Sequence, residues 1–69
     1  MWHQETPLET AERQVRESEE LIARQEALVR SLKEQGQRPM IYDAVVFLQS
    51  LRAEQRERVA TLKRLRILE

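Results

Sequence analysis

The sequence predicts an all-α fold: an antiparallel two-helix hairpin, with helices at about residues 7–35 and 39–68. Three observations predict it. The only glycine, Gly36, separates two long stretches rich in strong helix formers. Apolar residues recur in both stretches with alternating spacings of three and four. A link of only a few residues makes helices of this length run antiparallel. Residues 1–69 therefore form a single hairpin domain, and we expect residues 1–6 to be a frayed N-terminal segment.

The first helix has clear start and stop signals. Thr6 precedes Pro7, which suits the first helical position, and Glu9 stands three residues after Thr6, as a capping box requires. Gly36 fits the left-handed position just past a helix end. Pro39 then suits the start of the second helix, which meets no further glycine or proline.

Each helix carries one continuous stripe of seam positions, expected to face the other helix. In the first helix the stripe is Leu8, Ala11, Val15, Ser18, Ile22, Gln25, Val29 and Leu32. In the second it is Ile41, Ala44, Leu48, Leu51, Gln55, Arg58, Leu62 and Leu65. Ser18, Gln25 and Gln55 interrupt the apolar stripe. This polar layer either fixes the register and the number of associated chains, or lies at a wet edge of the seam.

The apolar surface is wider than one neighbouring helix can cover. Leu21 and Leu28 flank the first stripe, Val45 and Val59 flank one side of the second, and Met40, Phe47 and Leu68 flank its other side. At 100° per residue, residues 45–48 point all round their helix. We therefore expect the hairpin to self-associate as a helical bundle or coiled coil, a homodimer or a higher oligomer. The expected interface is Leu21, Leu28, Val45, Val46, Phe47, Leu48, Leu51, Leu62 and Leu65. A helix of another protein is an alternative partner for the same surface.

Charge is balanced overall but divided along the chain. Twelve basic and twelve acidic residues cancel, yet residues 1–34 hold five basic and eight acidic residues, net −3, and residues 52–69 hold six and three, net +3. We expect Glu12, Glu17, Glu19 and Glu20 to approach the basic half of the second helix. This favours an electrostatic match within the hairpin. The alternative is a phosphate-binding patch for nucleic acid, formed by Arg56, Lys63, Arg64 and Arg66.

The residue types argue against an enzyme, a cofactor or a metal site. The chain has no cysteine, one histidine (His3) and one aspartate (Asp43), so it cannot assemble a catalytic triad or the usual zinc ligand sets. Its single glycine forms no phosphate-binding loop. Trp2 and His3 precede the first cap, where they form either a lid over the open end or an anchor for a partner.

Membrane insertion is also not expected. The longest uninterrupted apolar run, Ala44 to Leu48, is far shorter than the roughly 20 residues that a membrane span needs. The N-terminus has neither the basic region nor the apolar core of a signal peptide, which predicts a cytoplasmic protein. Weak association of the Leu62–Leu68 end with a membrane surface is the least favoured alternative.

The segment AERQVRESE at residues 11–19, with IARQ at 22–25, Leu28-Val29, Leu32 and Gly36, resembles uncharacterised short bacterial helical-hairpin proteins of the AERxV…IxRQxxLV type. The resemblance covers the first helix and the turn, about half of the chain. The second helix departs from it, because such proteins often have more histidine and acidic residues where this chain has Ile41-Tyr42-Asp43 and Val45-Val46. The resemblance implies a bacterial origin, and it supplies neither an activity nor functional residues.

Together these features predict a non-enzymatic, oligomeric helical hairpin that acts as a protein–protein interaction or structural module. The alternative is a small regulatory accessory protein that binds nucleic acid through the basic half of its second helix.

Overall fold

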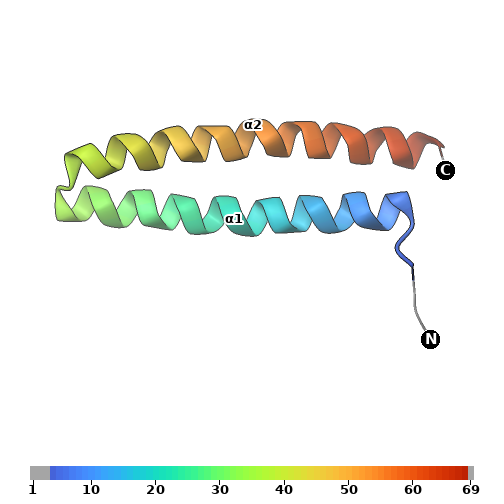
Figure 1. Cartoon of the computed structure of the whole chain (residues 1–69), viewed down its shortest axis with the longest axis horizontal. Helices are drawn as coiled ribbons and strands as arrows, with labels where there is room; N and C mark the ends of the chain where they lie inside the picture. Colours follow the sequence, from blue (N-terminus) through green and yellow to red (C-terminus); the bar gives the residue numbers. More distant parts are fainter. Residues whose placement is uncertain (1–3, 69) are drawn as a thin grey trace.

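A computed structural model, which describes residues 4–68, confirms the all-α hairpin. Helix α1 spans Pro7–Gln35 and helix α2 spans Arg38–Leu68. The two run side by side in opposite directions, with the tight turn at one end of the rod, and the start of α1 and the end of α2 at the other (Figure 1). The first helix has the bounds that the sequence predicts. The second begins one residue early, because the Gln37 carbonyl already accepts the first helical hydrogen bond, from the Ile41 N–H at 2.9 Å.

The start of α1 is the predicted capping box. The Glu9 N–H donates to Thr6 Oγ1 at 3.1 Å, and the Thr6 N–H donates to Glu9 Oε1 at 3.0 Å. Glu5, in the segment expected to fray, accepts a hydrogen bond from Arg13 Nε at 3.0 Å, so it is tied to the second turn of α1. The predicted lid or anchor, Trp2-His3, lies outside the described residues.

The turn closes on Gly36, whose φ of 71° and ψ of 27° are left-handed. In this conformation its N–H donates to the Lys33 carbonyl at 3.2 Å, and the Gln37 N–H donates to the Leu32 carbonyl at 3.1 Å. These two bonds satisfy carbonyls that the end of α1 would otherwise leave without partners. Side chains with a β-carbon pay a steric penalty in this conformation, so glycine suits the position.

The core lies along the predicted seam. All sixteen seam positions are buried or half-buried, and no other described residue is fully buried. The buried residues are Ala11, Ser18, Ile22, Val29, Leu32, Ala44, Leu48 and Leu62. Five of them, Ile22, Val29, Leu32, Ala44 and Leu48, form one cluster in the half of the rod nearest the turn. Towards the open end the seam also holds the buried Ala11, Ser18 and Leu62.

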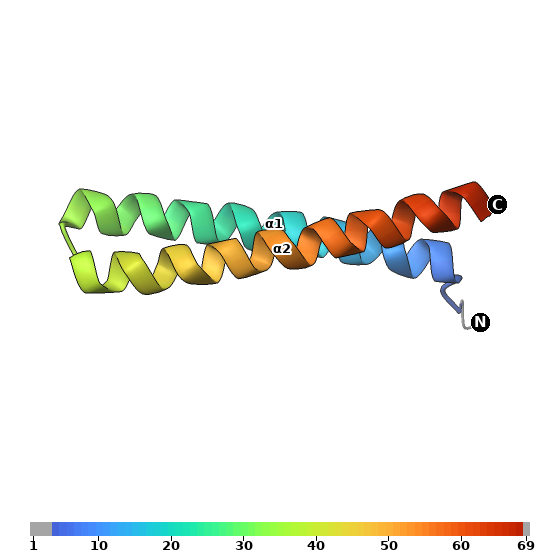
Figure 2. The ribbon, with the colours of Figure 1, turned by 90° about the horizontal axis from the view of Figure 1, so that it is seen from above.

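The hairpin is a single layer of two helices that cross at a shallow angle (Figure 2). Its extents are 48 × 28 × 13 Å and its radius of gyration is 15.8 Å, whereas a compact domain of this length has about 11 Å. It exposes 5745 Å² of surface, about a quarter more than the roughly 4,600 Å² of a compact protein of this mass. Neither helix, over the residues described, is both long and apolar enough to cross a membrane.

Candidate interaction surfaces

The two long sides of the hairpin, left and right of the seam, differ in chemistry. On one side, which we call the ion-paired side, two ion pairs join the helices: Glu26 Oε2 to Arg52 Nη2 at 2.8 Å, and Glu12 Oε2 to Arg66 Nη2 at 3.8 Å. All four side chains are 41–59% exposed, so each pair contributes no more than about 1 kcal/mol. The pairs nevertheless bridge α1 and α2 at two separate levels of the rod.

The opposite side, which we call the apolar side, is defined by Leu21, Leu28, Met40 and Phe47. Each of these side chains is 45–55% exposed. Near the turn they border a shallow groove of about 380 Å³, lined by Gln25 and Leu28 from α1 and by Met40, Asp43, Ala44 and Phe47 from α2. Leu21 is seven residues before Leu28 and therefore continues the same line along α1. No ion pair joins the helices here within residues 4–68.

Helical geometry places these surfaces on opposite sides of the seam. In α2, Met40 and Phe47 are seven residues apart and share one flank, whereas Arg52 and Arg66 are fourteen apart and share the other. The buried Ala44 and Leu48 lie between these flanks and face α1. A partner on the apolar side would therefore leave the ion pairs accessible.

The burial pattern shows which members of the predicted oligomer interface the hairpin itself already covers. Leu48 and Leu62 are each only 6% exposed, because both face α1 and belong to the interior of the hairpin. Leu51 and Val45 are half-buried against the core cluster near the turn, and Leu65 is also half-buried. The sequence analysis assigned Leu48, Leu51, Leu62 and Leu65 both to the seam between the helices and to the oligomer interface. Side chains that α1 already covers have little surface left for a second chain.

Four members of the predicted interface remain exposed: Leu21, Leu28, Val46 and Phe47. Val46 is 44% exposed but is absent from the groove, because it lies 100° round the helix from Phe47. Met40 lines the groove although the predicted interface omitted it. Its position seven residues before Phe47 was the signal that could have included it.

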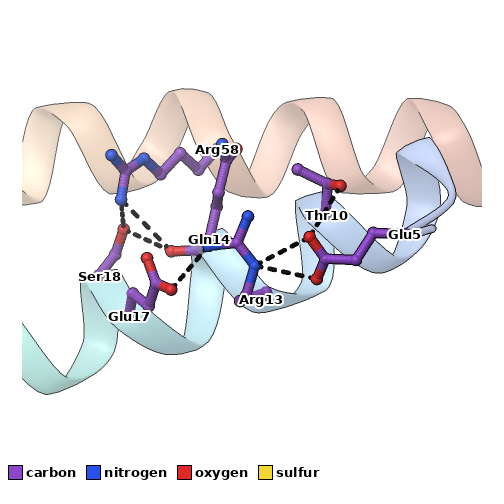
Figure 3. A network of polar contacts seen from close by, with 7 residues as sticks. All are labelled: Glu5, Thr10, Arg13, Gln14, Glu17, Ser18 and Arg58. Atoms are coloured by element: carbon purple, nitrogen blue, oxygen red, sulfur yellow. Dashed lines mark hydrogen bonds and ion pairs between the residues drawn. The ribbon is translucent and has the colours of Figure 1, made fainter. Parts of the chain in front are cut away.

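The polar layer is an organised network at the centre of the rod (Figure 3). Ser18 is 4% exposed; its hydroxyl donates to the Gln14 carbonyl at 2.9 Å and accepts from Arg58 Nη1 at 2.6 Å. Arg58 also donates to Glu54 Oε1 at 3.0 Å and, with poorer geometry, to the Gln14 carbonyl at 3.4 Å. Ser18 therefore does not lie at a wet edge. The sequence placed Arg58 on the seam but did not assign it this role.

Gln25 forms the second polar link across the seam. Its Nε2 donates to the Ala44 carbonyl at 2.9 Å, which joins the middle of α1 to the backbone of α2. Among the described residues, no buried side-chain nitrogen or oxygen lacks a hydrogen-bond partner. Gln25 and the Ser18–Arg58 pair thus fix how the two helices of one hairpin align. Gln55, the third member of the predicted layer, is half-buried and lines a groove on α2 instead. The predicted control over the number of associated chains stays a prediction.

A separate carboxylate–guanidinium cluster lies on α1 near the open end, where Arg13 stands between Glu5 and Glu17 (Figure 3). Arg13 contacts Glu5 at 3.0 Å and Glu17 at 2.8 Å. Hydrogen bonds to Glu5 and then to Glu17, together with their negative charges, raise the pKa of the Arg13 guanidinium above its ordinary value. The two carboxylates stabilise the charged form of a guanidinium that is protonated throughout the neutral range in any case. Glu17 therefore pairs within α1 and not with the basic half of α2.

The predicted match of α1 acids with α2 bases holds only in part. Glu12 reaches Arg66, but Glu19 and Glu20 form no ion pair with a described residue. The main additional pair, Glu26 with Arg52, lies closer to the turn than expected.

The predicted nucleic-acid patch is divided round α2. Arg64 donates to Thr61 Oγ1 at 3.2 Å, and Arg66 approaches Glu12. Arg56 and Lys63 instead line a groove of about 340 Å³ on another part of the helix surface. Of the four predicted residues, only these two share a site.

No cluster of three or more potential metal-ligating side chains is present among residues 4–68. Comparison of the chain with models of protein families, with curated proteins and with solved structures gives no match.

Proposed function

We propose that the protein is a non-enzymatic, cytoplasmic interaction module that works as a self-associated hairpin, with a second copy packed on its apolar side. The observation that carries the proposal is the grouping of half-exposed Leu28, Met40 and Phe47 round one groove, with Leu21 in line behind them. Exposed apolar groups gathered in one patch are typical of interaction sites, whereas scattered single ones are not.

The area available supports a second copy as the occupant. The surface in excess of a compact protein is about 1,100 Å², close to the roughly 600–1,000 Å² that each partner contributes to a standard interface. Covering the exposed halves of the four apolar side chains stabilises the dimer by roughly 3–6 kcal/mol per chain. Two hairpins joined in this way have the architecture of a four-helix bundle.

The composition of the apolar side also favours a copy of the same chain over a charged partner. The groove is bordered by one charged side chain, Asp43, and the remaining lining side chains are apolar or amide. A two-fold axis through this side would bring the same apolar groups together from both chains and would satisfy both patches at once. A single binding event thereby removes the exposed apolar surface of two molecules.

Phe47→Glu and a matched control, Val46→Glu, test the proposal. Both positions are exposed on the same turn of α2, 55% and 44% respectively, but only Phe47 lines the groove. Light scattering coupled to size-exclusion chromatography at micromolar concentration should give at least twice the 8.3 kDa chain mass for the wild type and for Val46→Glu. Phe47→Glu should give a helical monomer.

Two results would contradict the proposal. One is a folded wild-type monomer at micromolar concentration. The other is equal dissociation by both substitutions, which would mean that added negative charge, and not loss of the apolar contact, separates the chains. Far-UV circular dichroism confirms in each case that the hairpin is still helical.

A further inference from the structure

A second groove runs along the outer surface of the C-terminal half of α2. Its volume is about 340 Å³, and its lining is Arg52, Gln55, Arg56, Val59, Ala60 and Lys63. Arg52 belongs to the ion-paired side, so this groove, which we call the basic groove, lies away from the apolar side. It stays accessible when a second copy covers Leu28 and Phe47, and the following inference is independent of self-association.

The chemistry of the basic groove is an apolar floor between cations. Val59 and Ala60 contribute the floor, and the aliphatic stems of Arg56 and Lys63 extend it. Arg52 is neutralised by Glu26 at 2.8 Å. In contrast, neither Arg56 nor Lys63 forms an ion pair or side-chain hydrogen bond with any described residue.

The spacing of these two cations indicates the shape of a partner. Arg56 and Lys63 are seven residues apart, so they lie on one face of α2, about 10.5 Å apart along its axis. Two acidic residues seven apart on another helix have the same separation and also share one face. Small apolar residues between those two acids would pack against Val59 and Ala60, the apolar floor of the groove. We propose that the basic groove docks an acidic amphipathic helix of a partner protein, whose carboxylates pair with Arg56 and Lys63.

A nucleic acid fits this groove less well. Of the three cations that line the groove, only Arg56 and Lys63 are free of an internal carboxylate. A duplex bound there would release few counterions and would show a salt slope of only about 2. The floor is apolar and offers nothing to phosphates. The groove is also hollow, which suits the ridge of a helix better than the plane of a lipid surface.

The test uses full-length protein and a synthetic probe. The probe is a fluorescein-labelled helix of about 20 residues, long enough to be helical in water, made of alanine and leucine with glutamates at seven-residue spacing on one face. Fluorescence anisotropy at low salt measures its affinity for the wild type, for Arg56→Glu/Lys63→Glu, and for the control Arg24→Glu/Arg30→Glu. The control removes two exposed cations of α1 that are also free of ion pairs, and it changes net charge equally.

The groove variant should bind at least about ten-fold more weakly than the wild type, because it loses two ion pairs and gains two repulsions. The control should lose less than about three-fold, and a probe with glutamine in place of glutamate should not bind the wild type. Absence of wild-type binding, or equal losses in both variants, would overturn the proposal. So would tighter binding of duplex DNA or of phosphatidylserine vesicles through the same two side chains. Light scattering on the same samples reports self-association separately.

Discussion

The contact between Arg58 and Ser18 should be measurable as a coupling energy across the seam. Arg58 Nη1 donates to Ser18 Oγ at 2.6 Å, and Ser18 is 4% exposed. The perturbation is a double-mutant cycle of Ser18→Ala, Arg58→Met and the two combined. Methionine keeps the unbranched stem and the helix propensity of arginine but removes its donors. The cycle isolates this one hydrogen bond from the other consequences of each substitution.

The size of the coupling follows from the burial of the two groups. A hydrogen bond to a charged group contributes about 1.5–3 kcal/mol when well shielded. The Arg58 side chain is 29% exposed and keeps its ion pair with Glu54 at 3.0 Å when Ser18 is removed, so part of the loss is recovered. We expect a coupling of about 1 kcal/mol. In a domain of this size, such a difference moves the melting temperature by about 4–8 °C.

Urea unfolding followed by far-UV circular dichroism measures the four proteins. Chain concentration is held constant, because association with a second copy would shift apparent stability. The double variant should be less destabilised than the sum of the single variants by the coupling energy. A coupling below about 0.3 kcal/mol, within the usual error of additivity, would mean that the bond does not form in solution.

Ser18→Leu provides an independent check on the same reasoning. At a position that is 4% exposed, a larger side chain overpacks the seam and displaces Arg58, so we expect a loss of about 1–3 kcal/mol. If Ser18 instead lay at a wet edge, the added leucine would find space and would stabilise the hairpin. The sign of the change therefore distinguishes the two roles predicted for the polar layer.

Two further substitutions test the turn and the core. Gly36→Ala should destabilise the hairpin by about 1–2 kcal/mol, because φ is 71° there although nothing lies within 4 Å of an added β-carbon; thermal melts at constant concentration should show the loss, and an unchanged midpoint would argue against the left-handed cap. Leu48→Ala should cost about 2–5 kcal/mol, a large share of the roughly 3–10 kcal/mol expected for a chain of this length. Urea titration should show this loss, whereas a cost below 1 kcal/mol would place Leu48 outside the core.

The fold could be predicted from local signals. Thr6, Pro7, Glu9 and Gly36 mark helix ends through chemistry that acts within a few residues, and the spacing of the seam depends only on the helix period. Because these signals depend only on residues close together in the chain, the sequence alone is sufficient to predict the bounds of α1. Only the start of α2 differed, since a backbone carbonyl outside the expected helix, that of Gln37, accepts the first bond.

The candidate surfaces could be predicted only in part, because they depend on which charges meet across the seam. Glu17 was expected to approach the basic half of α2, yet it pairs with Arg13 on its own helix. Competition of this kind is decided by side-chain reach and not by net charge per segment. The predicted nucleic-acid patch shows a related difficulty. Its four members were grouped by proximity in sequence, but consecutive residues such as Lys63 and Arg64 point about 100° apart round the helix.

The division of the hairpin into an ion-paired side and an apolar side limits how it can assemble. Two hairpins that met through their ion-paired sides would have to desolvate Glu12, Glu26, Arg52 and Arg66, and the cost of removing such groups from water often exceeds the gain from pairing them. Meeting through the apolar side avoids this cost and removes the exposed parts of Leu28 and Phe47 from water. The ion pairs between α1 and α2 therefore contribute little to the stability of one hairpin, but they favour association through the apolar side. Each chain of the resulting bundle would still expose its own basic groove. A partner with two acidic helices would then occupy both grooves at once and bind more tightly than through one groove alone.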